Sequence, residues 1–203
     1  MTNEIADVYN YISRDFSKTR YSHWKGVKKF LDNIPSYSLV ADCGTGNGKY
    51  LNYRKDLMVI GNDISSKLAS IAKYNKNITN EVILANCINL PYKSKCFDHT
   101  ISIAVLHHLS SKESHILFIK ELIRITNKSL LITVWALEQN IKSNWKHVSN
   151  HDYLIPWNLG YNKIMRPYHL FSKDELDDIL KEINCKYNLS YEMDNWFINI
   201  NLI

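Results

Sequence analysis

The sequence lacks any apolar run long enough to cross a membrane. Its longest run, ISIAVL at residues 101–106, has only the length of a β-strand. The first ten residues also lack the basic region followed by an apolar stretch that marks a signal peptide. We therefore expect no membrane partner and a cytoplasmic location; an additional nuclear location is compatible with the sequence.

Paired cysteines are missing as well. The four cysteines are scattered along the chain and form no C-x-x-C pair: Cys43, Cys87, Cys96 and Cys185. This spacing predicts a reduced protein that has no structural zinc site and no metal ligands of its own.

Nothing in the 203 residues marks an internal boundary, because the sequence has no repeat, no linker rich in proline or serine and no block of like charge. One domain over residues 1–203 is expected, and this length suffices for a single good core. The net charge of +5 is mild, so it permits a polyanionic partner without requiring one.

The glycine-rich turn in LVADCGTGNGKYL, residues 39–51, fits neither of two common nucleotide motifs. A P-loop needs a glycine where Cys43 stands and a magnesium-binding hydroxyl where Tyr50 stands. A dinucleotide fingerprint needs its third glycine at the position of Lys49. What remains is an acid followed by alternating glycines, namely Asp42, Gly44, Gly46 and Gly48.

Five apolar runs have the length of buried strands, at residues 38–43, 57–63, 81–86, 99–105 and 130–135. Continuous apolar strands that alternate with helices are typical of a parallel sheet covered on both faces. Two later strands, at about 187–192 and 196–202, flank a tight turn at Asp194-Asn195. The prediction is an α/β domain with a doubly wound, mostly parallel sheet of seven strands that ends in an antiparallel hairpin.

Helices are expected between these strands. Apolar residues repeat at helical spacing over about 8–16 and 24–31, and a short helix is expected from about Lys49. Ser65 or Ser66 can cap the next helix. Two capping boxes open the later helices, Ser110 with Glu113 and Ser172 with Glu175.

Polar residues follow three successive strands, at the edge where ligands bind in an open parallel sheet. The glycines let the backbone approach a ligand with no Cβ in the way. Asp63 ends the second strand, where its carboxylate can accept both hydroxyls of a ribose, and Asn86 ends the third, where its amide can face an adenine amino group. Asp63 could instead cap the following helix, and Asn86 could be an ordinary turn residue. Their occurrence together with the glycine turn favours a cofactor site.

This combination resembles the class I S-adenosylmethionine-dependent methyltransferases. In that class the glycine turn approaches the methionine moiety, the second-strand acid holds the ribose, and the third-strand polar group contacts adenine. The resemblance therefore implies S-adenosylmethionine as the cofactor. It assigns cofactor binding to Asp42, Gly44, Gly46, Gly48, Asp63, Asn86 and Ala104.

A closer resemblance covers nearly the whole chain. The segments TRY, SIAVLHH, VWALEQ and PYHLF occur in the order expected for the eukaryotic tRNA methyltransferases that esterify 5-carboxymethyluridine at the wobble position. That group includes the methyltransferase domain fused to an AlkB-like dioxygenase in animals. This chain departs from the family at Asn86, where an aspartate is usual, at TNKS, where a Pro-Gly-Gly turn is usual, and in a short segment after ALEQ.

The resemblance implies transfer of a methyl group to a carboxylate, which gives a methyl ester. A carboxylate is already ionised at neutral pH, so no general base is needed. The protein must instead hold the carboxylate in line with the S–methyl bond in a dry pocket.

Seven residues in or near the family motifs are candidates for this task. The catalytic candidates are Arg20 and Arg166 for the carboxylate or a phosphate, His108 at the mouth of the site, and Trp135 for stacking on a flipped base. Substrate binding is expected from Tyr21, His107 and Lys25. The structural alternatives are a surface ion pair for Arg20, a satisfied structural role for one of the two histidines, core packing for Trp135, and a solvated helix face for Lys25.

The resemblance also implies two partners. The anticodon stem-loop of tRNA is the expected substrate, and a small zinc-binding activator subunit is expected to add a strand at the third-strand edge, residues 81–86. Residues 1–35 and 136–203 are assigned to the substrate side, and residues 36–135 to the cofactor-binding core. Two alternatives stay open: a methyltransferase of another nucleic acid or a small carboxylic acid, and a non-catalytic subunit that keeps the fold.

Overall fold

The structure is a computed structural model that describes residues 3–203. The helices in this part of the chain are α1 (Asn3–Thr19), α2 (Lys25–Asp32), α3 (Ser66–Asn75), the short 3-10 helix η1 (Leu106–His108), α4 (Lys112–Ile125) and α5 (Lys173–Ile183). The strands are β1 (Leu39–Cys43), β2 (Met58–Asp63), β3 (Glu81–Leu84), β4 (Phe97–Ile103), β5 (Thr126–Trp135), β6 (Lys146–Ser149), β7 (Asp152–Leu159), β8 (Asn162–His169), β9 (Tyr187–Glu192) and β10 (Asn195–Asn201).

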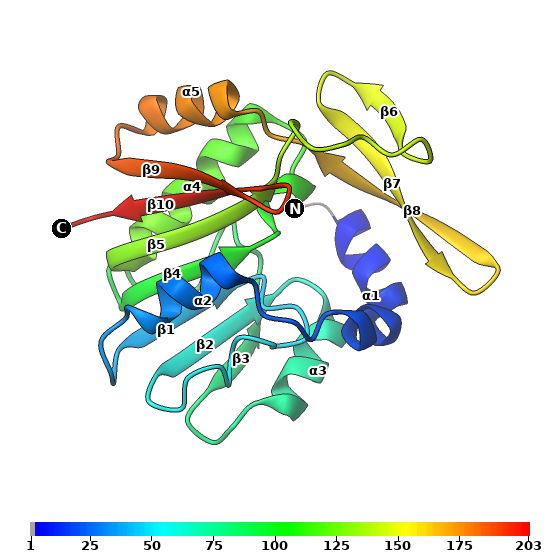
Figure 1. Cartoon of the computed structure of the whole chain (residues 1–203). Coiled ribbons are helices and arrows are strands. Elements are labelled where there is room, and N and C mark those ends of the chain that lie inside the picture. Colours follow the sequence, from blue (N-terminus) through cyan, green and yellow to red (C-terminus); the bar gives the residue numbers. More distant parts are fainter. Residues whose placement is uncertain (1–2) are drawn as a thin grey trace.

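The larger sheet has seven strands in the order β3-β2-β1-β4-β5-β10-β9 (Figure 1). Strands β1 to β5 pair in parallel, whereas β10 pairs antiparallel with both β5 and β9. Strand order reverses between β1 and β4, so the crossover connections leave in opposite directions there and open a crevice at the carboxyl ends of the strands. The predicted fold class is confirmed.

Helices cover both faces of this sheet. Successive residues of a strand point to opposite faces, and in these strands both sets of side chains are apolar and pack against helices. Ala41 and Leu130 belong to the core cluster that includes α4 and α5. Their chain neighbours Val40 and Leu131 belong to the cluster that includes α2 and α3. The doubly wound arrangement follows directly from this alternation.

No helix begins at Lys49, where the sequence predicts a short one. Residues 48–53 form turns held by bonds between residues three apart, such as Leu51 N–H to the Gly48 carbonyl. In an α-helix the Lys49 carbonyl would accept from the Tyr53 N–H. It accepts instead from His23 Nε2 at 2.8 Å, which takes away the bond that would propagate a helix.

Two predicted boundaries shift by one residue. The capping box that opens α4 pairs Ser111 with Ser114, one residue after the predicted Ser110 and Glu113, because the Ser111 hydroxyl accepts from the Ser114 N–H. The hairpin turn lies at Met193-Asp194, because these two residues take the positive φ angles of 48° and 62° that a two-residue hairpin loop requires. At α5 half of the predicted capping box is present: the Ser172 hydroxyl accepts from the Glu175 N–H, whereas the Glu175 carboxylate bonds to His151 and His169.

A second, antiparallel sheet of β6, β7 and β8 was not predicted. Pro156 and Pro167 lie within β7 and β8, and proline weakens the sequence signal for a strand. Figure 1 shows this small sheet beside α1, which contacts both β8 and α3. The sheet therefore faces the carboxyl ends of the parallel strands across α1. No helix in residues 3–203 has the length and apolar character needed to span a membrane.

Candidate functional site

A cavity of about 290 Å³ lies between the carboxyl ends of the parallel strands, α1 and β8. Nine of the predicted site residues line it: Arg20, Asp42, Gly44, Gly46, Asp63, Ala104, His108, Trp135 and Arg166. Five predicted residues do not: Tyr21, Lys25, Gly48, Asn86 and His107. The sequence therefore locates the cavity, although not every residue assigned to it.

The glycine turn needs its glycines for two different reasons. Gly44 has φ +78°, and a Cβ there would lie 2.2 Å from Val105 Cγ2, so the turn would be pushed off the strand ends. A Cβ on Gly48 would lie 2.9 Å from the Cβ of Ala72 in α3. Gly48 is therefore needed for close packing of the turn against α3. The sequence had predicted that it binds the cofactor.

Two buried carboxylates end β1 and β2. Asp42 accepts a hydrogen bond from the Thr45 hydroxyl at 2.7 Å, and Asp63 accepts from the backbone N–H groups of Gly46 and Ser65 at 2.8 and 2.9 Å. Burial raises the pKa of each carboxyl to about 6, and these hydrogen bonds oppose the rise. Asp63 also stabilises the start of α3, so both of its suggested roles are compatible with its position. This end of the cavity is electronegative.

Asn86 lies outside the cavity lining. Its side-chain oxygen accepts from the Ile88 N–H at 3.2 Å, which makes it a turn residue of the kind given as the alternative. The cavity wall that follows Asp63 contains the apolar side chains Ile64 and Leu68. The structure therefore places Asn86 in a turn outside the cavity lining, and its contact with adenine stays a prediction.

Arg166 is the most unusual charge in the cavity. It is 3% exposed, yet no carboxylate among the described residues forms an ion pair with it. Its guanidinium donates to the Tyr168 hydroxyl at 2.7 Å and to the Tyr9 hydroxyl at 3.4 Å, and its buried Nε has no partner in residues 3–203. A buried cation without a counterion is unfavourable unless an anion joins it. The wall formed by α1 and β8 is therefore suited to an anionic group.

Arg20 extends the same positive wall. Its guanidinium carbon lies 5.4 Å from the ring centre of Phe16 and 5.2 Å from that of Trp157. Arg166 lies 4.8 Å from the same Trp157 ring. The indole is held by a 2.9 Å bond from its Nε1 to Asp15, so one fixed ring orients both cations.

His108 is held as a neutral imidazole. Its Nδ1 donates to the Pro167 carbonyl at 3.1 Å, so its Nε2 carries the lone pair and accepts from the Tyr9 hydroxyl at 2.8 Å. Burial and, to a lesser extent, nearby Arg166 lower its pKa to about 3, although the hydrogen bond to the Pro167 carbonyl opposes them. Both ring nitrogens are engaged, so His108 positions Tyr9.

His107 lies behind the cavity wall. It is 1% exposed and stacks on Tyr168 with the ring centres 4.6 Å apart. Its Nδ1 accepts from the Trp135 backbone N–H at 3.3 Å. With this burial His107 has the position of the structural histidine given as the alternative, and its direct contact with the substrate stays a prediction.

Trp135 lines the cavity at the end of β5 and stacks against Trp145 with the ring centres 5.6 Å apart. Tyr21 is 77% exposed and Lys25 is also exposed, so both lie on the surface outside the cavity. The sequence missed Tyr9, Trp157 and Tyr168. Tyr168 lies inside the PYHLF segment, which was a usable signal, whereas Tyr9 lies on an ordinary helical face.

The chain resembles known methyltransferases in sequence. A family model described as a methyltransferase domain matches residues 41–131. The tRNA (carboxymethyluridine(34)-5-O)-methyltransferase of Schizosaccharomyces pombe is 31% identical over 96% of this chain and 94% of its own length. The Xenopus tropicalis protein of the same name, alkbh8, is 44% identical over 69% of this chain, but the chain spans only 22% of that relative's length.

Solved structures share the fold. A DhpI–SAH complex superposes with a TM-score of 0.76 at 10% identity, over 98% of this chain and 95% of that one. A methyltransferase in complex with the Haloferax volcanii Trm112 methyltransferase activator gives a TM-score of 0.70 at 15% identity, over 98% of this chain and 97% of that one.

The strand order, the glycine turn and these likenesses define a class I methyltransferase. Because the Schizosaccharomyces pombe relative matches over nearly its whole length, the chain belongs to the tRNA (carboxymethyluridine(34)-5-O)-methyltransferase family.

The cavity fits S-adenosylmethionine, the cofactor of this class. The cofactor is cationic at its sulfonium and its amino group, and the strand-end wall presents the buried carboxylates of Asp42 and Asp63. Gly46 leaves the wall open, because the atom nearest to an added Cβ would be a Phe16 ring carbon at 3.5 Å. Asp63, Asp42 and the turn backbone are therefore the groups that would hold the cofactor.

Proposed function

We propose that this chain transfers the methyl group of S-adenosylmethionine to the carboxylate of 5-carboxymethyluridine at the wobble position of tRNA, giving the methyl ester. The observation that carries the proposal is Arg166, a buried guanidinium without a counterion in the same cavity as the glycine turn. We infer tRNA as the substrate from the family to which the chain belongs. We infer a carboxylate as the methyl acceptor from Arg166, because a buried cation without a counterion can bind it.

The chain's own residues have to orient the nucleophile and exclude water. When bound, S-adenosylmethionine supplies a sulfonium methyl group, which passes to a carboxylate oxygen as the C–S bond breaks, leaving a methyl ester and a neutral thioether. No proton moves, which agrees with a neutral His108 whose ring nitrogens are both occupied. Arg166 can hold one carboxylate oxygen, while the second oxygen stays free to attack. The aromatic wall keeps this region dry.

The route for the RNA runs from the exposed basic residues into the cavity. Lys25, Lys28 and Lys29 lie on the exposed side of α2, and Tyr21 lies just before that helix. Basic side chains there can follow phosphates, and Arg20 and Trp135 at the cavity can receive the extruded nucleotide. These roles are part of the proposal.

The test follows labelled methyl transfer into tRNA that carries 5-carboxymethyluridine but lacks the methyl ester, with nucleoside mass spectrometry of the product. A methyl ester at the wobble uridine is the expected result. Free small carboxylic acids serve as the parallel substrate. Transfer to these acids and not to tRNA would contradict the proposal, as would cofactor binding without transfer to either substrate.

We further propose that a small activator subunit binds at β3. This strand is one edge of the larger sheet and pairs only with β2 among the described strands. Large apolar side chains gather near this edge: Leu84 is 61% exposed and Ile78 is 97% exposed. An unpaired edge with exposed apolar side chains is suited to strand addition by a partner. The Haloferax volcanii complex is a precedent in a protein of the same fold.

Co-expression with a small zinc-binding activator of this type should raise the soluble yield and the transfer rate of the chain. Leu84→Lys should abolish that gain by placing a charge in the edge. Leu117→Lys is the matched control, because Leu117 is similarly exposed on α4, away from β3. Full activity of the purified single chain, unchanged by the activator, would contradict this part of the proposal.

A further inference from the structure

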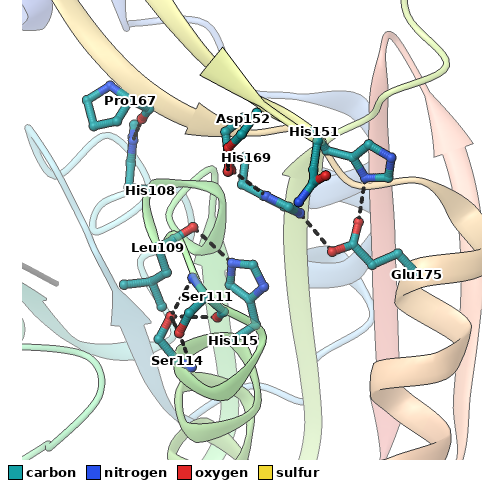
Figure 2. A network of polar contacts seen from close by, with 12 residues as sticks. His108, Leu109, Ser111, Ser114, His115, His151, Asp152, Pro167, His169 and Glu175 are labelled. Carbon is teal, nitrogen blue, oxygen red and sulfur yellow. Dashed lines mark hydrogen bonds and ion pairs between the residues drawn. The ribbon is translucent and has the colours of Figure 1, made fainter. Parts of the chain in front are cut away.

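Three histidines and two carboxylates converge outside the cavity (Figure 2). His115 comes from α4, His169 from the end of β8 and Glu175 from the first turn of α5. Asp152 is the first residue of β7, and His151 lies in the turn just before it. One donor atom each of His115, His169 and Glu175 lie within 4.8 Å of one another. None of the five residues lines the cavity described above.

His115 offers a buried lone pair that nothing in residues 3–203 uses. It is 1% exposed, and its Nε2 donates to the Leu109 carbonyl at 2.9 Å. A carbonyl only accepts, so the neutral ring has its lone pair on Nδ1, which is buried and has no hydrogen-bond partner in this part of the chain. A histidine whose other nitrogen is fixed by a backbone carbonyl has the usual arrangement of a metal ligand.

His169 lies between two carboxylates. Its Nδ1 is 2.7 Å from Asp152 Oδ1, and its Nε2 is 2.7 Å from Glu175 Oε1. The second Glu175 oxygen is 3.0 Å from His151 Nδ1. Without a metal, a proton lies between each ring nitrogen of His169 and the carboxylate oxygen that the nitrogen faces. A cation placed between Nε2 and Glu175 would replace one of these protons, with Asp152 orienting the ring from behind.

We propose that His115, His169, His151 and Glu175 bind one divalent zinc-type ion. Three imidazole nitrogens and one carboxylate oxygen make a donor set that suits Zn²⁺ in a closed tetrahedral site. The charges also balance, because Glu175 and Asp152 together offset the two positive charges of the ion.

The site is close to the required geometry. Tetrahedral zinc ligands lie about 3.3 Å apart when the bonds are about 2.0–2.1 Å, so the donor atoms of His115, His169 and Glu175, which lie within 4.8 Å of one another, must approach by at most about 1.5 Å. His151 Nδ1 is already 3.0 Å from the second Glu175 oxygen. The side chains of Glu175 and His151 are 24% and 35% exposed, which leaves an entry path and room to rotate. The buried ring of Phe171, 4.7 Å from both His115 and His169, forms the apolar floor.

The ion would tie α4 and α5 to the small sheet that carries Arg166. The cysteine pattern predicted no zinc site, and this proposal revises that prediction. Cysteine spacing cannot reveal four ligands that come from four separate elements and include no cysteine. The proposal stands independently of the proposed substrate, because it requires only the fold.

The experiment measures the metal content of the purified full chain and its titration with Zn²⁺ and Co²⁺ after chelation. We expect one ion per chain, the visible absorption bands of tetrahedral Co²⁺, and a rise in melting temperature on adding Zn²⁺. If the chain has to be purified with a zinc-binding activator, each variant complex is compared with the wild-type complex, and the expected difference is one ion.

His115→Gln and His151→Gln should each lose the ion and the Co²⁺ bands. His151 is the more exposed position, so that variant keeps the test valid if His115→Gln fails to fold. His147→Gln is the control, because His147 lies in the neighbouring strand β6, where its ring bonds to the Asn150 carbonyl and packs against Tyr153. No metal bound by the wild-type chain, or metal retained by both cluster variants, would overturn the proposal and leave a protonated hydrogen-bond network in its place.

Discussion

The two ends of the cavity differ in charge and in construction. The strand end carries Asp42 and Asp63, and backbone hydrogen bonds hold its turn against β2. The opposite end carries Arg166, and aromatic side chains from α1, β7 and β8 hold it. The first end suits a cationic cofactor and the second an anionic substrate. The difference shows that the fold alone keeps the carboxylates at one end of the cavity and the guanidinium at the other, without a bound cofactor or substrate.

Arg166→Met should have the largest effect on the difference between the two ends. It removes the only buried cation that the described residues place at the substrate end, while filling a similar volume. Loss of a charged hydrogen bond to the carboxylate predicts a decrease in kcat/KM for tRNA on the order of 100-fold. The affinity for S-adenosylhomocysteine, measured by calorimetry, should stay within about twofold, because the strand end is untouched.

The matched control is Arg14→Met, which removes an exposed arginine of α1. A similar loss of transfer in both variants would show that the effect comes from overall charge. A parallel loss of cofactor affinity in Arg166→Met would contradict the division between the two ends.

Asp42→Asn should stabilise the ligand-free chain while weakening cofactor binding. The fold raises the pKa of Asp42 from 3.8 to about 6, so the native state holds its proton more tightly than the unfolded chain does. Wild-type stability therefore falls as the pH rises from about 4 to about 6. The substitution removes this penalty, so we expect a gain of about 1–2 kcal/mol in unfolding free energy at pH 7 that disappears near pH 4.

Denaturant titrations at several pH values measure this gain. Asp56→Asn is the control of opposite sign, because the ion pair with Arg54 lowers the pKa of Asp56. That variant should lose stability at neutral pH, and the loss should vanish as the pH falls through the folded pKa of Asp56. If the unfolding free energies of the two variants changed with pH in the same direction, the conclusion that buried carboxylates make the strand end electronegative would be wrong.

Arg20→Ala should have a smaller effect than the change at Arg166. Arg20 is partly exposed and contacts Phe16 and Trp157 through cation–π interactions, which are worth about 1 kcal/mol at such sites. Transfer to tRNA should fall roughly fivefold with cofactor affinity intact. A matched loss of cofactor binding, seen by the same calorimetry, would remove the argument for a substrate role.

Tyr9→Phe should produce the smallest change. It removes the hydroxyl that donates to His108 and contacts Arg166, but it leaves both charges and the ring in place. We expect transfer to fall about two- to fivefold, mainly through a higher KM for tRNA. An unchanged KM would show that Arg166 is oriented by Tyr168 and Trp157 alone.

The sequence predicts the strand end of the cavity better than the opposite end. Asp63 could be located because a strand pattern ends there and parallel strands finish at one edge. Arg166 was identified only through a family motif, and nothing local indicated that it would be buried without a counterion. Tyr9 carried no signal, because its contact with His108 spans 99 residues of sequence.

Two predicted site residues lie outside the cavity lining for local reasons. Asn86 follows its strand as expected, but its side chain bonds to the turn that it opens. His107 and His108 are adjacent, and the short helix η1 directs one ring behind Tyr168 and the other into the cavity. Neighbouring residues of one type cannot be distinguished until the backbone conformation is known.

The position of β10 bears on how the chain is made. This strand is the last to be synthesised of all the strands described, yet it lies inside the sheet, with β5 on one side and β9 on the other. While the ribosome is still adding residues, β5 therefore presents an unpaired edge on the nascent chain. The sheet can close only after residue 201 has emerged, so the β5 edge stays open to aggregation until the end of β10 has been made.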